Sequence, residues 1–511
     1  MSLVPFLAVP MLLSGVSLAA APDPSVMSAA YWEKWNAAEQ ARIDADIEKH
    51  RMADCVFSAD GLKPGTEVTV EQLTHDFIFG AHIFNFDQLG ADKLNEAYKA
   101  LYGTLFNSAT VPFYWREFEP EEGKMRFDAE ARDTAAFWNN CSNPKHQFHW
   151  RRPAPGPIVD FCERKGIRAH GHVLAWGNYM WQVPQWLTDK AGAELDFMQG
   201  ATRGNNDWSP KGTGGRDELQ RDKKAIFEEL SIDELQRQAP NYIQALNDTL
   251  ARRIYAIALR YGDRIQSWDV ANESATDYGA GRLIPGDKIC KSHYGPMPGD
   301  YAYRAFKLAE SVFPSSVKLN INDYVGDHRY YSQVTNMLAR GCKIDIVGSQ
   351  MHLFDPNQIV AISEGDDIET PEIVRKRFEL LGRIGRPIHL SEITITSPTN
   401  TPCGLDMQAI VARNLYRLWF SLKPMMGITW WNVVDDCGAP GEPSVSGLFT
   451  RQMQPKPAYF ALDKLINHEW RTNLKVTVSP DGKVKFRGFK GRYRLTWKED
   501  GKTRCSEITV R

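Results

Sequence analysis

The chain has 511 residues, more than a single compact core of ordinary size, so its length predicts either several domains or one large barrel with attachments. Hydrophobic residues make up 43% and charged residues 24% of the sequence, which excludes disordered, collagen-like and coiled-coil proteins. The 61 Lys and Arg residues nearly balance the 63 Asp and Glu residues, for a formal net charge of −2. Because the sequence also has no basic run, neither nucleic acid nor an anionic membrane is expected as a partner.

The first segment, residues 1–21, is apolar and ends in small residues, as a secretory signal peptide does. It is too short and too often interrupted by proline to span a bilayer, and no later segment is long and apolar enough to do so. No Lys or Arg precedes its apolar part, so a buried N-terminus is the alternative. We expect an exported protein, in the periplasm or outside the cell.

The two flanks of the chain share one pattern. Residues 22–75 begin with a helical stretch over 30–50 and continue as alternating strands with turn signals over 51–75. The last segment, 469–511, repeats this alternation. We expect the flanks to pair into one small accessory β-module.

Between the flanks, over 76–468, apolar runs of strand length alternate with segments of helical periodicity. The expected strands are 77–83, 109–115, 167–176, 265–273, 317–324, 344–353, 387–395 and 427–435, and the expected helices include 92–105, 232–261, 301–311, 328–340, 370–384 and 405–421. Eight strand-then-helix units make a (β/α)8 TIM barrel, so the predicted fold class is α/β.

Two further features bear on the site. Segment 188–222 is rich in Gly, Asn and charge and follows the third expected strand, so we expect a long loop over the site. The eight cysteines are scattered without a C-x-x-C motif, which indicates neither a zinc site nor a disulfide-dense scaffold and leaves an individual disulfide open.

Two glutamates are the candidate catalytic residues. Glu273 closes the fourth expected strand and Glu392 lies in the seventh, so both reach the C-terminal rim of the barrel. Such a pair suggests hydrolysis of a glycosidic bond, in which one carboxylic acid protonates the departing oxygen and the other carboxylate attacks the anomeric carbon or activates water. A single glutamate there would more often cap a helix or meet an arginine. Asn272 alternates to the opposite strand face from Glu273, so its amide reaches a sugar only if the strand end bends.

Seven ordered motifs across roughly 76–468 resemble those of family 10 glycoside hydrolases, the endo-β-1,4-xylanase family. They are E-P-E-E-G-K-M-R-F-D at 119–128, H-G-H-V-L-A-W at 170–176, W-D-V-A-N-E at 268–273, N-D-Y at 322–324, G-S-Q-M-H at 348–352, H-L-S-E-I-T at 389–394, and G-I-T-W-W-N-V-V-D at 427–435 with the later P-K-P-A-Y at 455–459.

The resemblance implies a double displacement with retention, in which Glu273 is the general acid/base and Glu392 the nucleophile. Retention predicts carboxyl groups about 5–5.5 Å apart. Glu273 is then expected to be protonated near about pH 6–7, while Glu392 stays ionised through hydrogen-bond donors. Other residues that the resemblance assigns to substrate binding are His172, Trp176, Asn272, Tyr324, Gln350, His352 and Trp431. For the histidines and tryptophans, ordinary core packing is the alternative.

The sequence departs from the family pattern at several places. Val111 and Tyr114 stand where the family commonly has an Asn and a Lys that hydrogen-bond the sugar in subsite −2. Gly177 replaces a His. Thr394 replaces an Asp that supports the histidine beside the nucleophile. Segment 436–443 has no second roofing Trp. These changes leave the carboxylate pair intact but weaken the assignment of the substrate.

The predicted function is therefore internal cleavage of β-1,4-xylosidic bonds in a xylan-like polysaccharide by a monomer that needs no cofactor and no metal. One alternative is a retaining glycosidase for another β-linked or decorated glycan, with 188–222 and 137–155 reshaping the cleft. A second is a non-catalytic glycan-binding protein. A third is a metal-dependent hydrolase, because His170 and His172 form an H-x-H pair.

Overall fold

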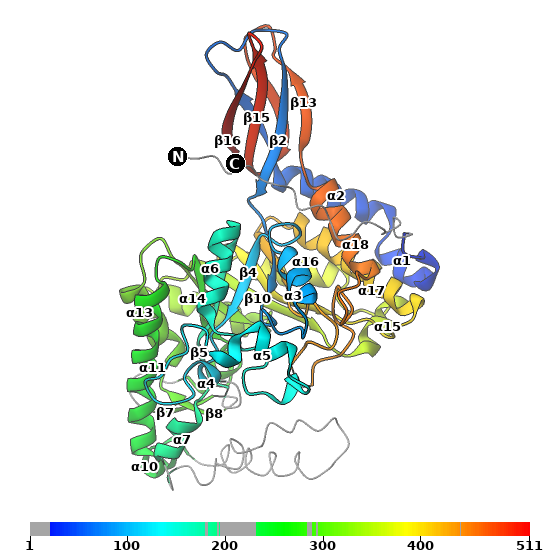
Figure 1. Ribbon diagram of the computed structural model, residues 1–511. Helices are drawn as coiled ribbons and strands as arrows, with labels where there is room; N and C mark the ends of the chain where they lie inside the picture. The colour runs from blue at the N-terminus through cyan, green and yellow to red at the C-terminus, as the bar shows by residue number, and fades with distance from the viewer. Residues whose placement is uncertain are drawn as a thin grey trace.

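The computed structural model describes residues 21–178, 182–191, 194, 231–283, 289–292, 295–439 and 441–511. Eight parallel strands close into a barrel in chain order (Figure 1). They are β3 (Ile78–His82), β4 (Ser108–Pro112), β5 (Arg168–Trp176), β6 (Ser267–Asn272), β9 (Lys318–Asp323), β10 (Ile346–Leu353), β11 (Ile388–Ile395) and β12 (Met425–Trp430). The predicted TIM barrel is confirmed.

Helices surround the barrel. They are α1 (Ala29–Lys34), α2 (Ala37–Arg51), α3 (Asp92–Ala100), α4 (Trp115–Phe118), α5 (Ala135–Asn139), α6 (Pro155–Lys165), α7 (Gln185–Ala191), α10 (Ile232–Gln238), α11 (Pro240–Tyr261), α12 (Ala275–Gly279), α13 (Tyr301–Val312), α14 (His328–Ala339), α15 (Pro356–Glu364), α16 (Pro371–Gly382), α17 (Pro402–Ser421) and α18 (Pro457–Asp463). A short hairpin, β7 (Ile289–Ser292) and β8 (Gly295–Pro298), lies after α12.

The barrel strands read as continuous apolar runs because helices cover the outside and side chains fill the inside. Every residue of β3, β4 and β11 is buried. Packing inside is close enough that a Cβ atom on Gly171 would lie 2.2 Å from the ring of Trp268, so only glycine fits there.

Two expected helical stretches are wrong in their continuity. The stretch 30–50 forms α1 and α2, with a break at Trp35 and Asn36. The stretch 232–261 forms two helices, α10 and α11, which meet at Ala239. Pro240 begins α11 because proline has no N–H to donate and disfavours a helical conformation in the residue before it.

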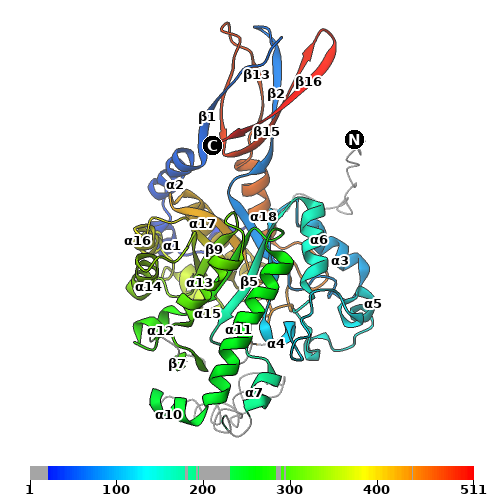
Figure 2. The same cartoon turned by 90° about the vertical axis from the view of Figure 1, so that its left-hand side faces the viewer.

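The accessory β-module combines strands from both flanks and stands at one end of the barrel (Figures 1 and 2). Its strands are β1 (Met52–Phe57), β2 (Glu67–His75), β13 (Asn473–Thr477), β14 (Val484–Phe489), β15 (Gly491–Glu499) and β16 (Lys502–Val510). Strand β1 pairs with β14, and the other four form a sheet in the order β13, β2, β15, β16. Alternating residues such as Val68, Val70 and Leu495 are buried in a core of their own.

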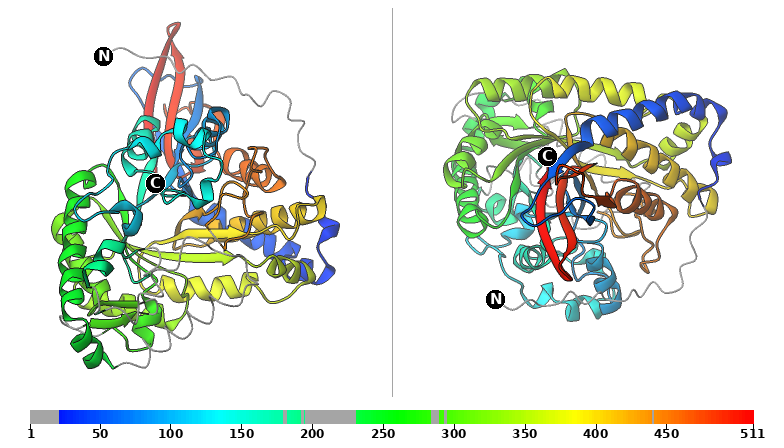
Figure 3. Two further views of the ribbon diagram at one scale, coloured as in Figure 1. Left: turned by 60° about the horizontal axis from the view of Figure 1, so that its bottom comes forward. Right: turned by 90° about the horizontal axis from the view of Figure 1, so that it is seen from above.

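An aromatic stack joins the module to the barrel. The ring of Trp470 lies 4.1 Å from that of Phe420 and 5.7 Å from that of Phe79, measured between centroids. Since β2 leads from the module directly into β3, the N-terminal ends of the barrel strands face the module. Figure 3 shows the module over the ring of barrel helices. The C-terminal ends of the strands therefore face away from it.

The structure bears on the predictions for the loop, the signal segment, the cysteines and the membrane spans. Most of the predicted loop 188–222 and nearly all of the predicted signal segment lie outside the described residues. All eight cysteines are free thiols, so no disulfide forms. Among the described residues, none of the helices is both long and apolar enough to cross a membrane.

Replacing Trp470 with alanine should lower the free energy of unfolding by about 3–5 kcal/mol, because a fully packed aromatic ring leaves a cavity where the module meets the barrel. Urea unfolding measures the loss. Leu259→Ala is the matched control: its side chain is 82% exposed, so the change should stay within about 0.5 kcal/mol. Equal losses in both variants would contradict the role of the stack.

Candidate active site

A cleft of about 870 Å³ opens at the C-terminal ends of the barrel strands, the end away from the module. Both candidate carboxylates, Glu273 and Glu392, line it. This is the face where TIM-barrel enzymes place their catalytic groups, because eight strand ends converge there.

Glu273 reaches the cleft because the end of β6 bends. The pairing of β6 with β9 shifts register between Asp269 and Ala271, and Glu273 has a φ of 53°, in the left-handed region. Such a conformation costs a residue with a side chain of the order of 1–3 kcal/mol and is typical of functional sites. The bend brings both Asn272 and Glu273 to the cleft. It is the bend that the sequence analysis made the condition for Asn272 to reach a sugar.

Glu273 is half-buried, and its carboxylate accepts hydrogen bonds from Trp176 and Gln350. Trp176 Nε1 donates to Oε2 at 3.1 Å, and Gln350 Nε2 donates to Oε1 at 3.3 Å. The backbone N–H of Glu273 donates to the carbonyl of Asn322 at 2.8 Å, which fixes the start of the turn.

Glu392 is more enclosed, with 5% of its surface exposed. Its Oε1 accepts from Asn322 Nδ2 at 2.7 Å and from Gln350 Nε2 at 3.1 Å. Its Oε2 lies 3.4 Å from His352 Nε2. Two side-chain amides and an imidazole therefore surround this carboxylate.

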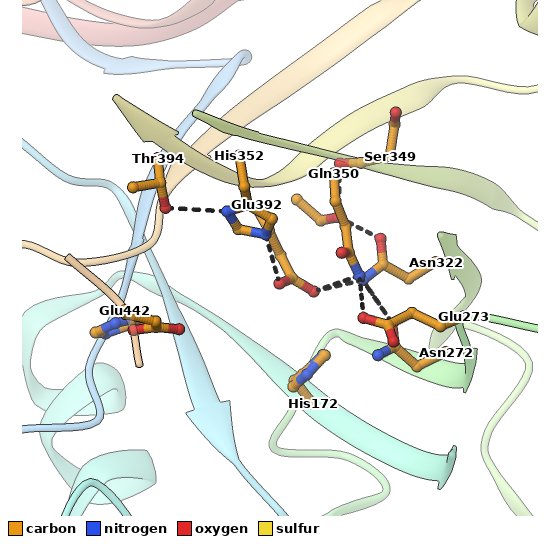
Figure 4. A network of polar contacts seen from close by, with 12 residues as sticks. His172, Asn272, Glu273, Asn322, Ser349, Gln350, His352, Glu392, Thr394 and Glu442 are labelled. Carbon is orange, nitrogen blue, oxygen red and sulfur yellow. Dashed lines mark hydrogen bonds and ion pairs between the residues drawn. The ribbon is translucent and has the colours of Figure 1, made fainter. Parts of the chain in front are cut away.

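Gln350 connects the two glutamates (Figure 4). Its Nε2 lies 3.3 Å from Glu273 Oε1 and 3.1 Å from Glu392 Oε1, so these oxygens cannot be further apart than the sum of the two distances, about 6.4 Å. Retaining glycosidases hold their carboxyl groups about 5–5.5 Å apart, and inverting enzymes about 6.5–9.5 Å, to leave room for a water molecule. This upper bound on one pair of oxygens is compatible with the spacing of retaining enzymes.

Asn322 belongs to this network, although the sequence analysis assigned no role to its side chain. Its Nδ2 donates to both Glu392 Oε1 and Asn272 Oδ1, the latter at 2.9 Å, and its Oδ1 accepts from Ser391 Oγ at 2.5 Å. Its place in the N-D-Y motif at 322–324 was the feature of the sequence that could have identified Asn322 as a site residue. With its carbonyl oxygen so engaged, Asn272 keeps its amide in the cleft wall.

Thr394 takes the supporting position behind His352. Its Oγ1 lies 2.9 Å from His352 Nδ1, and Phe354 stacks on the imidazole with centroids 4.4 Å apart. A hydroxyl thus replaces the carboxylate that the family pattern places there. The ring is held with its other nitrogen toward Glu392.

His172 shares a buried acceptor with His170. Asp269 Oδ2 lies 2.9 Å from His172 Nδ1 and 2.9 Å from His170 Nε2. Burial opposes protonation of His172, but the hydrogen bond to Asp269 and the nearby carboxylates of Glu392 and Glu273 outweigh it and raise the pKa of His172. Burial also opposes ionisation of Asp269, yet the two imidazoles hold the pKa of this carboxyl well below its ordinary value.

The H-x-H pair is therefore engaged by a carboxylate. Within the described parts of the chain, no group of three or more His, Cys, Asp and Glu side chains is arranged to hold a metal ion. The geometry gives the metal-dependent alternative no ligand set there.

Aromatic rings form the walls of the cleft. Trp431 lies edge-on to His172 and His352, with centroids 5.5 and 6.2 Å away, and Trp176 meets the edge of Tyr114 at 6.0 Å. Tyr324 is 45% exposed at the rim, and its hydroxyl lies 3.2 Å from that of Thr276. All the predicted substrate-binding residues thus line one cleft.

Two of the departures from the family pattern, Tyr114 and the loop 436–443, line the cleft together with two arginines. The guanidinium of Arg152, from segment 137–155, lies 3.7 Å above the ring of Tyr114. Arg151 Nη2 donates to Asn432 Oδ1 at 3.1 Å and lies 3.7 Å from Glu442 Oε2. Charged side chains thus line the wall, among them Glu442 in the loop that has no second Trp.

A TIM barrel whose two glutamates face one cleft from the ends of β6 and β11 defines a glycoside hydrolase. Glycosyl hydrolase family 10 matches residues 91–203 and 230–465, more than half of the chain. The chain belongs to this family.

Curated relatives are distant. Endo-1,4-beta-xylanase B of Thermotoga neapolitana is 24% identical over 361 residues, which is 68% of this chain and 83% of that protein. The thermostable celloxylanase of Thermoclostridium stercorarium is 27% identical over 415 residues, 76% of this chain and 91% of that protein. Endo-1,4-beta-xylanase A of Thermoanaerobacterium saccharolyticum is 26% identical over 315 residues, 60% of this chain and only 22% of that protein.

The fold is also that of solved xylanases. Xylanase 10B from Thermotoga petrophila, in complex with xylobiose, matches with a TM-score of 0.50 and 18% identity, over 77% of this chain and 95% of that chain. Native xylanase 10B from Thermotoga maritima gives the same score and identity, over 77% and 96%.

Asp269→Asn should lower the free energy of unfolding by about 3–5 kcal/mol near pH 6, because it leaves the imidazolium of His172 buried without its counter-charge. Asp269, with a lowered pKa, stabilises the fold above its unfolded value of about 3.8, and this contribution is lost on acidification. His172, with a raised pKa, contributes below about pH 6.5, and its contribution is lost as the pH rises through the folded-state pKa. Urea unfolding should therefore show a smaller penalty at pH 8 than at pH 6.

The matched control for this prediction is Asp128→Asn, which removes a surface carboxylate paired with Arg260. Exposed pairs contribute at most about 1 kcal/mol. A penalty for Asp269→Asn that does not vary between pH 6 and pH 8 would contradict the charge-based account.

Proposed function

We propose that this protein is an endo-acting hydrolase that cleaves β-1,4-xylosidic bonds in xylan with retention of configuration. The observation that carries the proposal is the shared hydrogen-bond donor, Gln350 Nε2, which keeps oxygens of Glu273 and Glu392 within about 6.4 Å. That spacing suits direct attack by a carboxylate rather than activation of an intervening water molecule.

In the first step, Glu392 attacks the anomeric carbon while Glu273 donates its proton to the departing glycosidic oxygen. The bond to the leaving sugar breaks, and an ester between the sugar and Glu392 forms. The step requires Glu273 to carry the proton and Glu392 to be the carboxylate that attacks. Donors from Asn322 and Gln350 hold the Glu392 carboxylate in place.

In the second step, Glu273 takes a proton from water as that water attacks the anomeric carbon. The ester bond to Glu392 breaks, and both carboxyl groups return to their starting states. Trp176 and Gln350 hold Glu273 through their hydrogen bonds during both proton transfers.

The names of the relatives support xylan as the polymer. A retaining glycosidase for a decorated or different β-linked glycan is the second candidate, because Tyr114 lies under the guanidinium of Arg152, where the family pattern has a Lys that binds the sugar. Products from a panel of xylans with and without acidic branches, sized beside other β-linked glycans, distinguish the two.

We also propose that residues 1–21 direct export and that the protein acts as a monomer. The composition of the segment supports the first proposal. N-terminal sequencing of secreted protein and light scattering in solution test these proposals.

Glu273→Gln should lower kcat on xylan about 10²–10⁴-fold, since it removes general acid–base catalysis, and Glu392→Gln should lower it at least as much. Reducing-sugar release measures both effects. Glu379→Gln, an exposed surface change, is the control, and an unchanged rate in either cleft variant would refute the assignment.

Azide separates the two roles. With Glu273→Ala and an activated aryl xylobioside, azide should capture the sugar ester of Glu392 and give a β-glycosyl azide. With Glu392→Ala, azide should take the place of the nucleophile and give the α-glycosyl azide. NMR of the products identifies the anomers, and the reverse assignment of anomers would exchange the roles of the two residues.

A further inference from the structure

A second cavity, of about 670 Å³, lies at the opposite end of the barrel, between the N-terminal strand ends and the module. Residues from α2, the end of β2, several barrel strands and the turn between β14 and β15 line it. Its volume falls in the range of ligand pockets, about 300–1,000 Å³. The catalytic cleft opens at the other end and shares no lining residue with it.

The lining is strongly cationic. Its Lys and Arg residues are Lys49, Arg51, Arg168, Lys318, Lys423 and Lys490, whereas Asp76 is its only carboxylate. Of these six cations, Lys318 alone forms an ion pair within the described chain, with Asp345 at 3.6 Å. The whole protein has a formal net charge of −2, so this concentration of positive charge is local.

The two arginines of the lining have a structural role. Arg51 donates to the carbonyls of Phe420 and Leu422 at the end of α17, and its guanidinium lies 4.9 Å from the centre of the Phe77 ring. Arg168 Nη2 donates to the carbonyl of Asp76 at 3.1 Å. These bonds fasten the barrel to the segment that leads to the module.

Three of the four lysines make no such contact. The side chains of Lys49, Lys423 and Lys490 make no hydrogen bond or ion pair in the described structure, yet all three line the same cavity. In addition, Arg168 Nη1 and His75 Nε2 are buried without a hydrogen-bond partner. The cavity therefore has cations without a counter-charge at its edge and nitrogen atoms without a hydrogen-bond partner in its lining. A negatively charged hydrogen-bond acceptor would satisfy both.

The floor between these cations is apolar, formed by side chains such as Phe77, Phe420 and Met425. We propose that this cavity binds a ligand with several negatively charged oxygens, phosphate or carboxylate, on a body that packs against the apolar floor. Neutral xylan has no such groups, so the site is independent of the cleavage reaction. An oxyanion would join the lysines to Arg168 and relieve their mutual repulsion.

Calorimetric titration of the full chain at low salt tests the proposal with two anionic probes, inorganic pyrophosphate and a tetramer of galacturonate. Xylotetraose is the neutral reference. We expect at least one anion to bind at one site per chain, and its affinity to fall as salt rises. The probe that binds identifies phosphate or carboxylate as the preferred group.

The variant Lys423→Gln/Lys490→Gln should weaken that binding at least tenfold. Lys376→Gln/Lys464→Gln, exposed lysines outside the cavity, removes the same charge and should weaken it less than twofold. Both variants should hydrolyse xylan at the wild-type rate, so a failure of the anion site is separate from a failure of the proposed reaction. Binding of neither anion, or equal weakening in both variants, would overturn the proposal.

Discussion

The active site depends on one amide group. Gln350 Nε2 donates toward both candidate carboxylates and toward Asn272 Oδ1. Asn322 repeats the arrangement from the neighbouring strand by linking Asn272 to Glu392. Because every donor and acceptor in this network comes from a barrel strand or its end, the spacing of the glutamates is fixed by the barrel and not by mobile surface side chains.

The barrel meets this constraint by departing from regular strands at the same end. Register shifts occur between Asp269 and Ala271 on β6 and between Ser349 and Gln350 on β10, and Glu273 adopts a left-handed conformation. Bulges redirect side chains that regular alternation would send to the opposite face. The left-handed conformation of Glu273 thus lies where the carboxylates must converge, while the stack around Trp470 secures the opposite end.

Much of this arrangement could be predicted from the sequence. The eight apolar runs and the two glutamates gave the barrel and its catalytic rim, since buried parallel strands leave a strong hydrophobic signal. The contacts between strands could not be predicted, because they depend on register. Only the register shows that Asp269 accepts from two histidines and that the amide of Asn322 bridges Asn272 and Glu392. Arg151 comes from an irregular segment whose path no periodicity predicts.

The module and the cleft divide the molecule into two ends with different properties. The cleft end has opposed carboxylates and aromatic walls. The cavity at the module end is lined by unpaired lysines and by apolar side chains. The central claim concerns the first of these, namely that Glu392 becomes covalently bonded to the sugar. A 2-fluoro xylobioside with a good leaving group slows the breakdown of such an ester, so mass spectrometry can detect it. The account predicts one added glycosyl group per chain, on the peptide that contains Glu392. A label on another residue, or no label together with inversion at the anomeric carbon during turnover, would contradict it.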